Sequence, residues 1–155
     1  MDYRGEHGRR GISRISITVI LRQCVLWCVF VVLVASAFNH FINPHFYDKM
    51  IPSFLPPLLV NFAAGIVEAL IAVLLVFPRY RSAGGLAFLL LMVAFLPIHL
   101  WDLIRDDPAV GSTVAAVLRF VMQYVLIYIG YVLWKTREES YGGKSSQDTA
   151  RSLPL

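Results

Sequence analysis

The chain contains 155 residues, of which 57% are hydrophobic and 15% are charged, and its formal net charge is +4. Soluble domains use about 45–50% apolar and about 25% charged residues, so this composition excludes an ordinary water-soluble domain. The length allows one domain, and apolar segments occupy most of it. We therefore expect a membrane protein whose surface is covered largely by lipid.

Four apolar segments are long enough to cross a bilayer, at about residues 17–41, 57–77, 83–101 and 114–134. Each is close to the ~20 residues that a helix needs to cross a hydrocarbon core of about 30 Å. Only helices and closed barrels can cross, and continuous apolar runs such as residues 86–95 lack the alternation of a barrel strand. The sequence predicts an all-α fold, an antiparallel bundle of four transmembrane helices spanning residues 17–137.

The first apolar segment has one alternative interpretation, a cleaved signal peptide. Basic residues precede it, and Ala35-Ser36-Ala37 fits a small-residue cleavage site. The apolar core of a signal peptide is usually about 7–15 residues long, and this run is longer. We therefore expect an uncleaved first helix.

The basic residues predict the orientation of the bundle. They are concentrated in the segment 1–16, in the connection at residues 79–81 and in the tail that follows the fourth span. The two other connections hold only Lys49 and Arg105, and the second is acidic. The positive-inside rule then places both termini in the cytoplasm and the protein in the inner, or plasma, membrane. Basic residues of this kind contact anionic lipid heads and require no nucleic-acid partner.

The connections differ in length and composition. Residues 78–82 form a short turn, so the second and third helices are expected to be antiparallel neighbours. The outer loop at residues 43–56 contains several prolines and the aromatic pair Phe46-Tyr47, which predicts an ordered cap on the outer mouth of the bundle. The tail at residues 138–155 is rich in Ser, Gly and charged residues, and is expected to be disordered in the cytoplasm.

Glu68 and Arg119 each interrupt an apolar span. A charge near the bilayer centre costs at least ~2.5–3.5 kcal/mol, so it usually has a partner or a function. Glu68 lies ~15 Å into its span and Arg119 lies in the outer half of its own, so we expect a buried polar pair. Three interpretations stay open: a pair that binds a head group or relays protons, a structural ion pair, and a protonated Glu68.

Further polar residues are predicted at a similar depth, and form a candidate ligand or structural cluster: Asn39, His40, Asn61, His99, Asp102 and Gln123. His99 and Asp102 share a helix face and could bind a metal, and two histidines on different helices could bind a haem. Neither pattern is specific, so no metal or other cofactor is predicted, although a quinone stays open. Cys24 and Cys28 are expected to pack as small apolar residues.

Several segments together resemble the DoxX-like family of small membrane proteins. They are residues 38–47, 51–56, 64–68, 78–81, 95–99 and 119–123, which include Asn39-His40, Gly65, Glu68, His99, Arg119 and Gln123. The resemblance covers roughly residues 17–137, and it implies a four-helix inner-membrane protein with both termini inside. The family is named for a subunit linked to a quinol oxidase and to thiosulfate oxidation, and most of its members have no assigned reaction.

Two functional hypotheses follow. The first is a non-catalytic subunit or assembly partner of a membrane complex, because the sequence contains no nucleophile with a partnered base and no nucleotide-binding motif. The second is a redox-associated protein that binds a quinone or lipid head group in the polar cluster of the outer half. A transporter is a weaker third hypothesis. The expected partners are membrane lipids and subunits of membrane or redox complexes, and self-association stays open.

Overall fold

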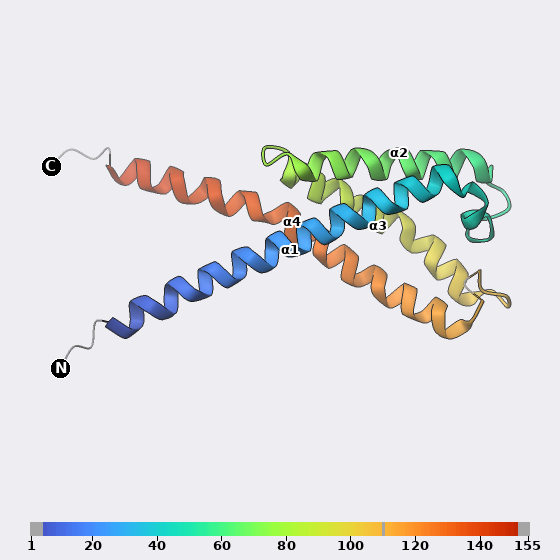
Figure 1. Cartoon of the computed structure of the whole chain (residues 1–155), viewed down its shortest axis with the longest axis horizontal. Coiled ribbons are helices and arrows are strands. Elements are labelled where there is room, and N and C mark those ends of the chain that lie inside the picture. Colours follow the sequence, from blue (N-terminus) through green and yellow to red (C-terminus); the bar gives the residue numbers. More distant parts are fainter. Residues whose placement is uncertain (1–4, 110, 152–155) are drawn as a thin grey trace.

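The computed structural model describes the backbone of residues 5–109 and 111–151, and the side chains of residues 17, 19–109 and 111–135. Within these residues the fold is helical throughout, which confirms the predicted fold class (Figure 1). The elements are α1 (Gly5–Ile42), the 3-10 helix η1 (Pro44–Met50), α2 (Pro57–Val76), α3 (Arg81–Ile104) and α4 (Thr113–Arg151).

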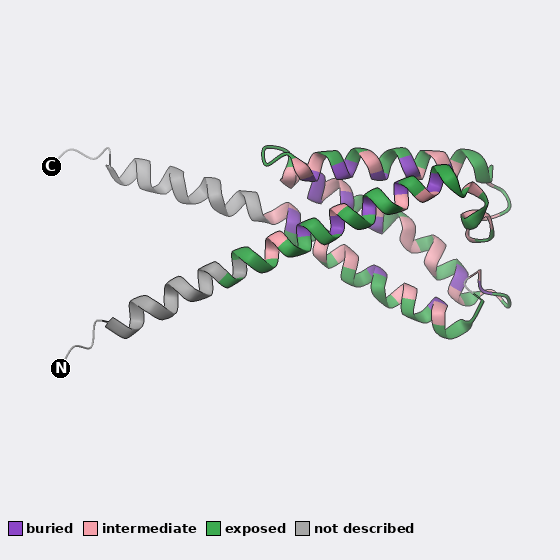
Figure 2. Ribbon diagram, viewed as in Figure 1, coloured by how far each residue is buried: buried purple, intermediate pink, exposed green. Residues whose placement is uncertain are grey.

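The four α-helices contain segments long and apolar enough to cross a membrane: Val19–Ile42, Pro57–Val76, Arg81–Ile104 and Thr113–Lys135. Large apolar side chains such as Val31, Leu70 and Leu118 are exposed on the outside of the bundle. Figure 2 shows this exposed surface along all four helices, with the buried residues in between. An apolar exterior on four spanning helices is the structure of a multi-pass membrane protein.

The helices run antiparallel in sequence order (Figure 1). α1 packs along α2, α2 along α3, and α3 along α4. We call the end that carries the connections 43–56 and 105–112 the loop end. The other end is the terminus end, where α1 begins, α4 finishes and the turn 77–80 joins α2 to α3. Both termini therefore leave the bundle on the same side.

Glycines allow α3 and α4 to approach closely. A Cβ atom added to Gly85 would lie 2.5 Å from the backbone nitrogen of Trp134, and one added to Gly130 would lie 2.9 Å from Cα of Leu89. Small residues at a helix interface permit this approach in membranes. An apolar core occupies the half of the bundle nearer the terminus end, and includes Leu26, Leu33, Ile71, Leu75, Phe88, Met92 and Leu133.

The connection between α1 and α2 forms the cap predicted from its prolines and aromatic residues. η1 packs against α1 and α2, and the Tyr47 ring stacks on the His40 ring with 4.0 Å between centroids. At the end of α3, Arg105 Nη1 donates a hydrogen bond to the Lys49 carbonyl at 2.7 Å. The cap is thus bound to both sides of the bundle at the loop end.

Two helices continue beyond the predicted spans. α1 begins at Gly5, and α4 extends to Arg151 through most of the tail for which the sequence predicts disorder. Extending an existing helix requires no new nucleus, which favours continuation past the membrane boundary. Residues 152–155 of that tail lie outside the described residues.

Candidate ligand-binding site

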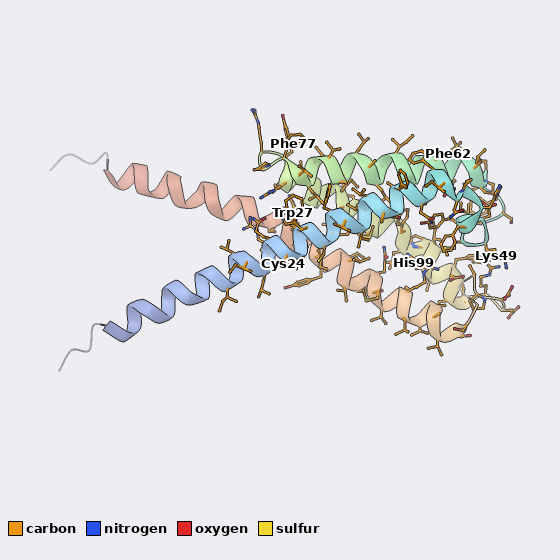
Figure 3. All side chains as sticks on the ribbon, viewed as in Figure 1. Cys24, Trp27, Lys49, Phe62, Phe77 and His99 are labelled. Carbon is orange, nitrogen blue, oxygen red and sulfur yellow. The ribbon has the colours of Figure 1, made fainter. Side chains whose placement is uncertain are left out.

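A cavity of about 510 Å³ lies within the bundle and is lined by all four helices and by the cap. Most of its lining is apolar. Its polar side chains come from α1, α2, α3 and α4, and we call the following set the polar cluster: His40, Asn61, Glu68, His99, Arg119 and Gln123. The sequence predicted all six. Figure 3 shows His99 towards the loop end, where Lys49 also lies, and Cys24 nearer the terminus end.

His40 and Asn61 connect the cap to the bundle. The Asn61 side-chain nitrogen donates to the carbonyls of Pro44, at 2.7 Å, and of His40, at 3.3 Å. Because both partners are acceptors, they determine which side-chain atom of Asn61 is the nitrogen. The Asn61 oxygen therefore faces His40 Nδ1, with which it shares a hydrogen bond. Nδ1 must carry the proton, since an amide oxygen only accepts.

Glu68 lies next to His40 and is 4% exposed. Its Oε2 is 3.7 Å from His40 Nε2, and Ser36 hydrogen-bonds the carboxylate from the preceding turn of α1. Gly65 makes this arrangement possible, because a Cβ there would lie 2.8 Å from Cβ of His40. With the proton of His40 on Nδ1, Nε2 and Oε2 are joined directly only by one further proton.

Arg119 has a different carboxylate partner from the one expected. Its Nη1 lies 3.5 Å from Oδ2 of Asp102, and its Nη2 is 3.2 Å from the Met50 sulfur in the cap. Asp102 Oδ1 also accepts a hydrogen bond from the Ala109 backbone at 2.6 Å. Among the described residues, Glu68 and Arg119 thus have separate partners, instead of forming the direct pair that the sequence suggested. The reason is packing: α4 lies along α3, which carries Asp102.

Four buried polar atoms have no hydrogen-bond partner among the described residues: Glu68 Oε2, His99 Nδ1, Asp102 Oδ2 and Arg119 Nη1. Leaving such a group unsatisfied costs about 1–3 kcal/mol. Glu68, His99 and Arg119 line the cavity and come from three different helices. The cavity therefore offers hydrogen-bonding groups to a molecule or to water inside it.

Gln123 has a structural contact within the site. Its side-chain nitrogen donates to the carbonyl of Met92, on α3. Pro97 lies inside the same helix, and a proline removes one backbone donor. Side chains of neighbouring helices commonly bind the backbone near such a break in membranes. Gln123 thus fastens α4 to α3 beside the cavity.

The two remaining predicted residues lie next to the cavity. Asp102 supports Arg119, and Asn39 donates a hydrogen bond to the Tyr47 hydroxyl at 3.0 Å. Sequence reasoning did not assign Ser36 or Met50 to the site. Ser36 could have been found, because it precedes His40 by one helical turn and shares its face. Nothing in the sequence indicates that Met50 reaches Arg119.

Other chemistry finds little support in this cavity. The side chains that the structure describes include no group of three or more His, Cys, Asp and Glu residues placed to hold a metal ion. Cys24 and Cys28 are free thiols on α1 and line the cavity away from the polar cluster. The arrangement can orient a polar head group and enclose an apolar chain.

Residues 29–134 match the family described as "Domain of unknown function (DUF8561)". This region is more than half of the chain, and it contains every residue of the polar cluster together with Asn39 and Asp102. No curated protein and no solved structure matches the chain. The protein therefore belongs to the DUF8561 family.

Proposed function

We propose that the protein is a non-catalytic protein of the inner membrane that binds an amphipathic small molecule, a quinone or a lipid, with its head group in the polar cluster. The observation that carries this proposal is the cavity with unpaired polar atoms at one end. Ligand sites are typically concave and mostly apolar, with a few converging polar groups. Ionisable residues within membrane spans are also expected to mark functional sites.

The unpaired atoms suit a head group that both accepts and donates hydrogen bonds. Arg119 Nη1 offers a donor, and Glu68 Oε2 offers an acceptor when ionised. His99 Nδ1 can take either role, according to its tautomer. A hydroxyl or carbonyl group placed between α2, α3 and α4 would satisfy them.

Residue distribution supports an orientation with the loop end outside the cell. The loop-end connections carry few basic residues, whereas Arg79 and Arg81 lie at the terminus end, where both chain termini also lie. The proposed site would then be in the outer half of the bilayer. The resemblance to DoxX-like proteins supports a role as a subunit or assembly partner near redox enzymes.

A purely structural role is the second candidate. The observation that favours it is the set of contacts from Asn61 and Arg119 to the cap, which hold the loop end together without any ligand. In that case the polar cluster would stabilise the fold and bind nothing.

The two candidates predict different results for purified protein. Organic extraction and absorbance would measure co-purified quinone, lipid or haem in wild type, Glu68→Gln and Arg119→Leu. We expect a bound molecule in wild type and folded variants with less of it. Arg22→Leu is the matched control, because Arg22 lies in the α1 span but does not line the cavity. An empty wild-type protein, together with unfolding of both variants, would leave only the structural role.

A further inference from the structure

The cavity extends through most of the membrane-spanning part of the bundle. On α1 its lining runs from Leu21 to His40, which is ~28 Å of helix and close to the ~30 Å hydrocarbon thickness of a bilayer. We propose that it holds one lipid with a single long hydrocarbon chain and an uncharged, oxygen-bearing head. The head lies at the loop end, and the chain crosses the midplane towards Cys24. This inference rests on the proposed function and narrows its ligand class.

The width of the cavity determines the number of chains. A volume of about 510 Å³ spread over ~28 Å corresponds to a channel roughly 5 Å wide. Carbon atoms in van der Waals contact lie about 3.5–4.0 Å apart, so a channel of this width accepts one hydrocarbon chain. Two chains side by side, as in a diacyl lipid, would need about twice the cross-section.

The charges at the loop end determine the kind of head group. Arg119 is the only Lys or Arg among the described residues that line the cavity, and Asp102 already balances its charge. Glu68 adds a second carboxylate and no positive charge. Phosphate sites instead gather Arg or Lys side chains that are free to bind the anion. An uncharged hydroxyl or carbonyl fits this balance better than a phosphate does.

The opposite half of the cavity is suited to a chain. Its lining there consists of apolar residues and the two cysteines, including Cys24, Cys28, Phe88 and Ile129. Among the described lining residues, the charged side chains Glu68 and Arg119 both belong to the polar cluster. A ligand with polar groups at both ends would leave one of them without partners in this half.

The cysteines provide a direct test, because they are the only two in the chain and both line the far half of the cavity. Full-length protein in phosphatidylcholine nanodiscs would be treated with a lipophilic maleimide, and labelling of Cys24 and Cys28 followed by mass spectrometry. The probes are geraniol, a long polyprenol, the matching polyprenyl phosphate and diacylglycerol. At about ten times its Kd, the long polyprenol should slow labelling about tenfold.

The other probes separate chain length, head charge and chain number. Geraniol is too short to reach the cysteines, the phosphate carries charge and diacylglycerol has two chains, so each should protect several-fold less. Glu68→Gln keeps the side-chain shape and should weaken protection by the polyprenol. In a chain with Cys24→Ser and Cys28→Ser, Val31→Cys provides a control on the lipid-exposed surface of α1, and no probe should protect it.

The outcomes distinguish this inference from the proposed function. Protection by diacylglycerol or by the phosphate that equals the polyprenol's, and that Glu68→Gln reduces, would overturn the single-chain inference and support a ligand site. Equal protection by geraniol would overturn the proposed position of the chain. Failure of every probe to protect, with no lipid extracted from wild type, would overturn both.

Discussion

Asn61 makes more contacts with the cap than any other membrane-embedded side chain described above. It is 1% exposed and binds the Pro44 carbonyl, the His40 carbonyl and the His40 ring. These contacts place the proton of His40 on Nδ1 and so determine what Glu68 meets. Asn61 therefore acts on the site through His40.

Replacing Asn61 by leucine should destabilise the protein. The substitution leaves two carbonyls and one ring nitrogen without their partner, which should lower the free energy of unfolding by about 1–3 kcal/mol. Reversible unfolding in mixed micelles measures this change. Asn43→Leu is the control, because Asn43 is exposed and its side chain makes one hydrogen bond, to Asn39. An equal effect of the two substitutions would contradict the role assigned to Asn61.

Asp102 and Arg119 should show energetic coupling. Asp102→Asn keeps an oxygen that can accept from Ala109 but removes the charge that faces Arg119. The Arg119 side chain is 31% exposed, so solvent screens part of the loss, and we expect about 1–3 kcal/mol. Adding Arg119→Met removes the unpaired charge. The double variant should therefore lose at least ~0.5 kcal/mol less than the sum of the single variants. Simple additivity would show that the pair contributes nothing.

The pair α3–α4 depends on close backbone contact at Gly85. A methyl group there would meet the backbone of Leu133 and Trp134, which cannot move aside as a flexible side chain can. Gly85→Ala should therefore push the helices apart and lower the free energy of unfolding by about 1–3 kcal/mol. Ala94→Val adds atoms on the exposed surface of the same helix and should have little effect. Thermal unfolding in detergent compares them, and an unchanged midpoint for Gly85→Ala would disprove this packing.

The orientation of the entire bundle can be tested from both sides of the membrane. In a chain with Cys24→Ser and Cys28→Ser, Ser53→Cys places a thiol at the loop end and Tyr80→Cys places one at the terminus end. A membrane-impermeant maleimide added to intact cells should label the first, because the basic residues favour a cytoplasmic terminus end. The second should react only after permeabilisation. The reverse pattern would show that the loop end faces the cytoplasm.

The fold is largely predictable from the chain because the bilayer sets the length of every span. Apolar runs near 20 residues separated by prolines and polar turns leave few alternatives to a four-helix bundle. The prolines and aromatic residues at 43–56 also predicted the cap correctly. The continuation of α4 to Arg151 was not predicted, since composition describes the tail in isolation and not as the extension of a helix.

The members of the site were easier to predict than their contacts. A polar side chain inside a span is conspicuous, and its depth follows from counting residues, so His40, Glu68, His99 and Arg119 could be placed in one half of the bundle. Which of them meet depends on the rotation of each helix about its axis. Gly65 and Gly85 influence that rotation through backbone contacts between helices, and no periodicity in the apolar runs reveals them.

Hydrophobic length and charge distribution, which each segment carries independently of its neighbours, were thus enough to predict four membrane spans and the depth of the polar residues. Tertiary packing alone decided that Glu68 faces His40, that Arg119 faces Asp102, and that a cavity separates them. The physical reason is that lipid surrounds every helix equally and does not select a partner for any side chain. Close contacts between helices make that selection.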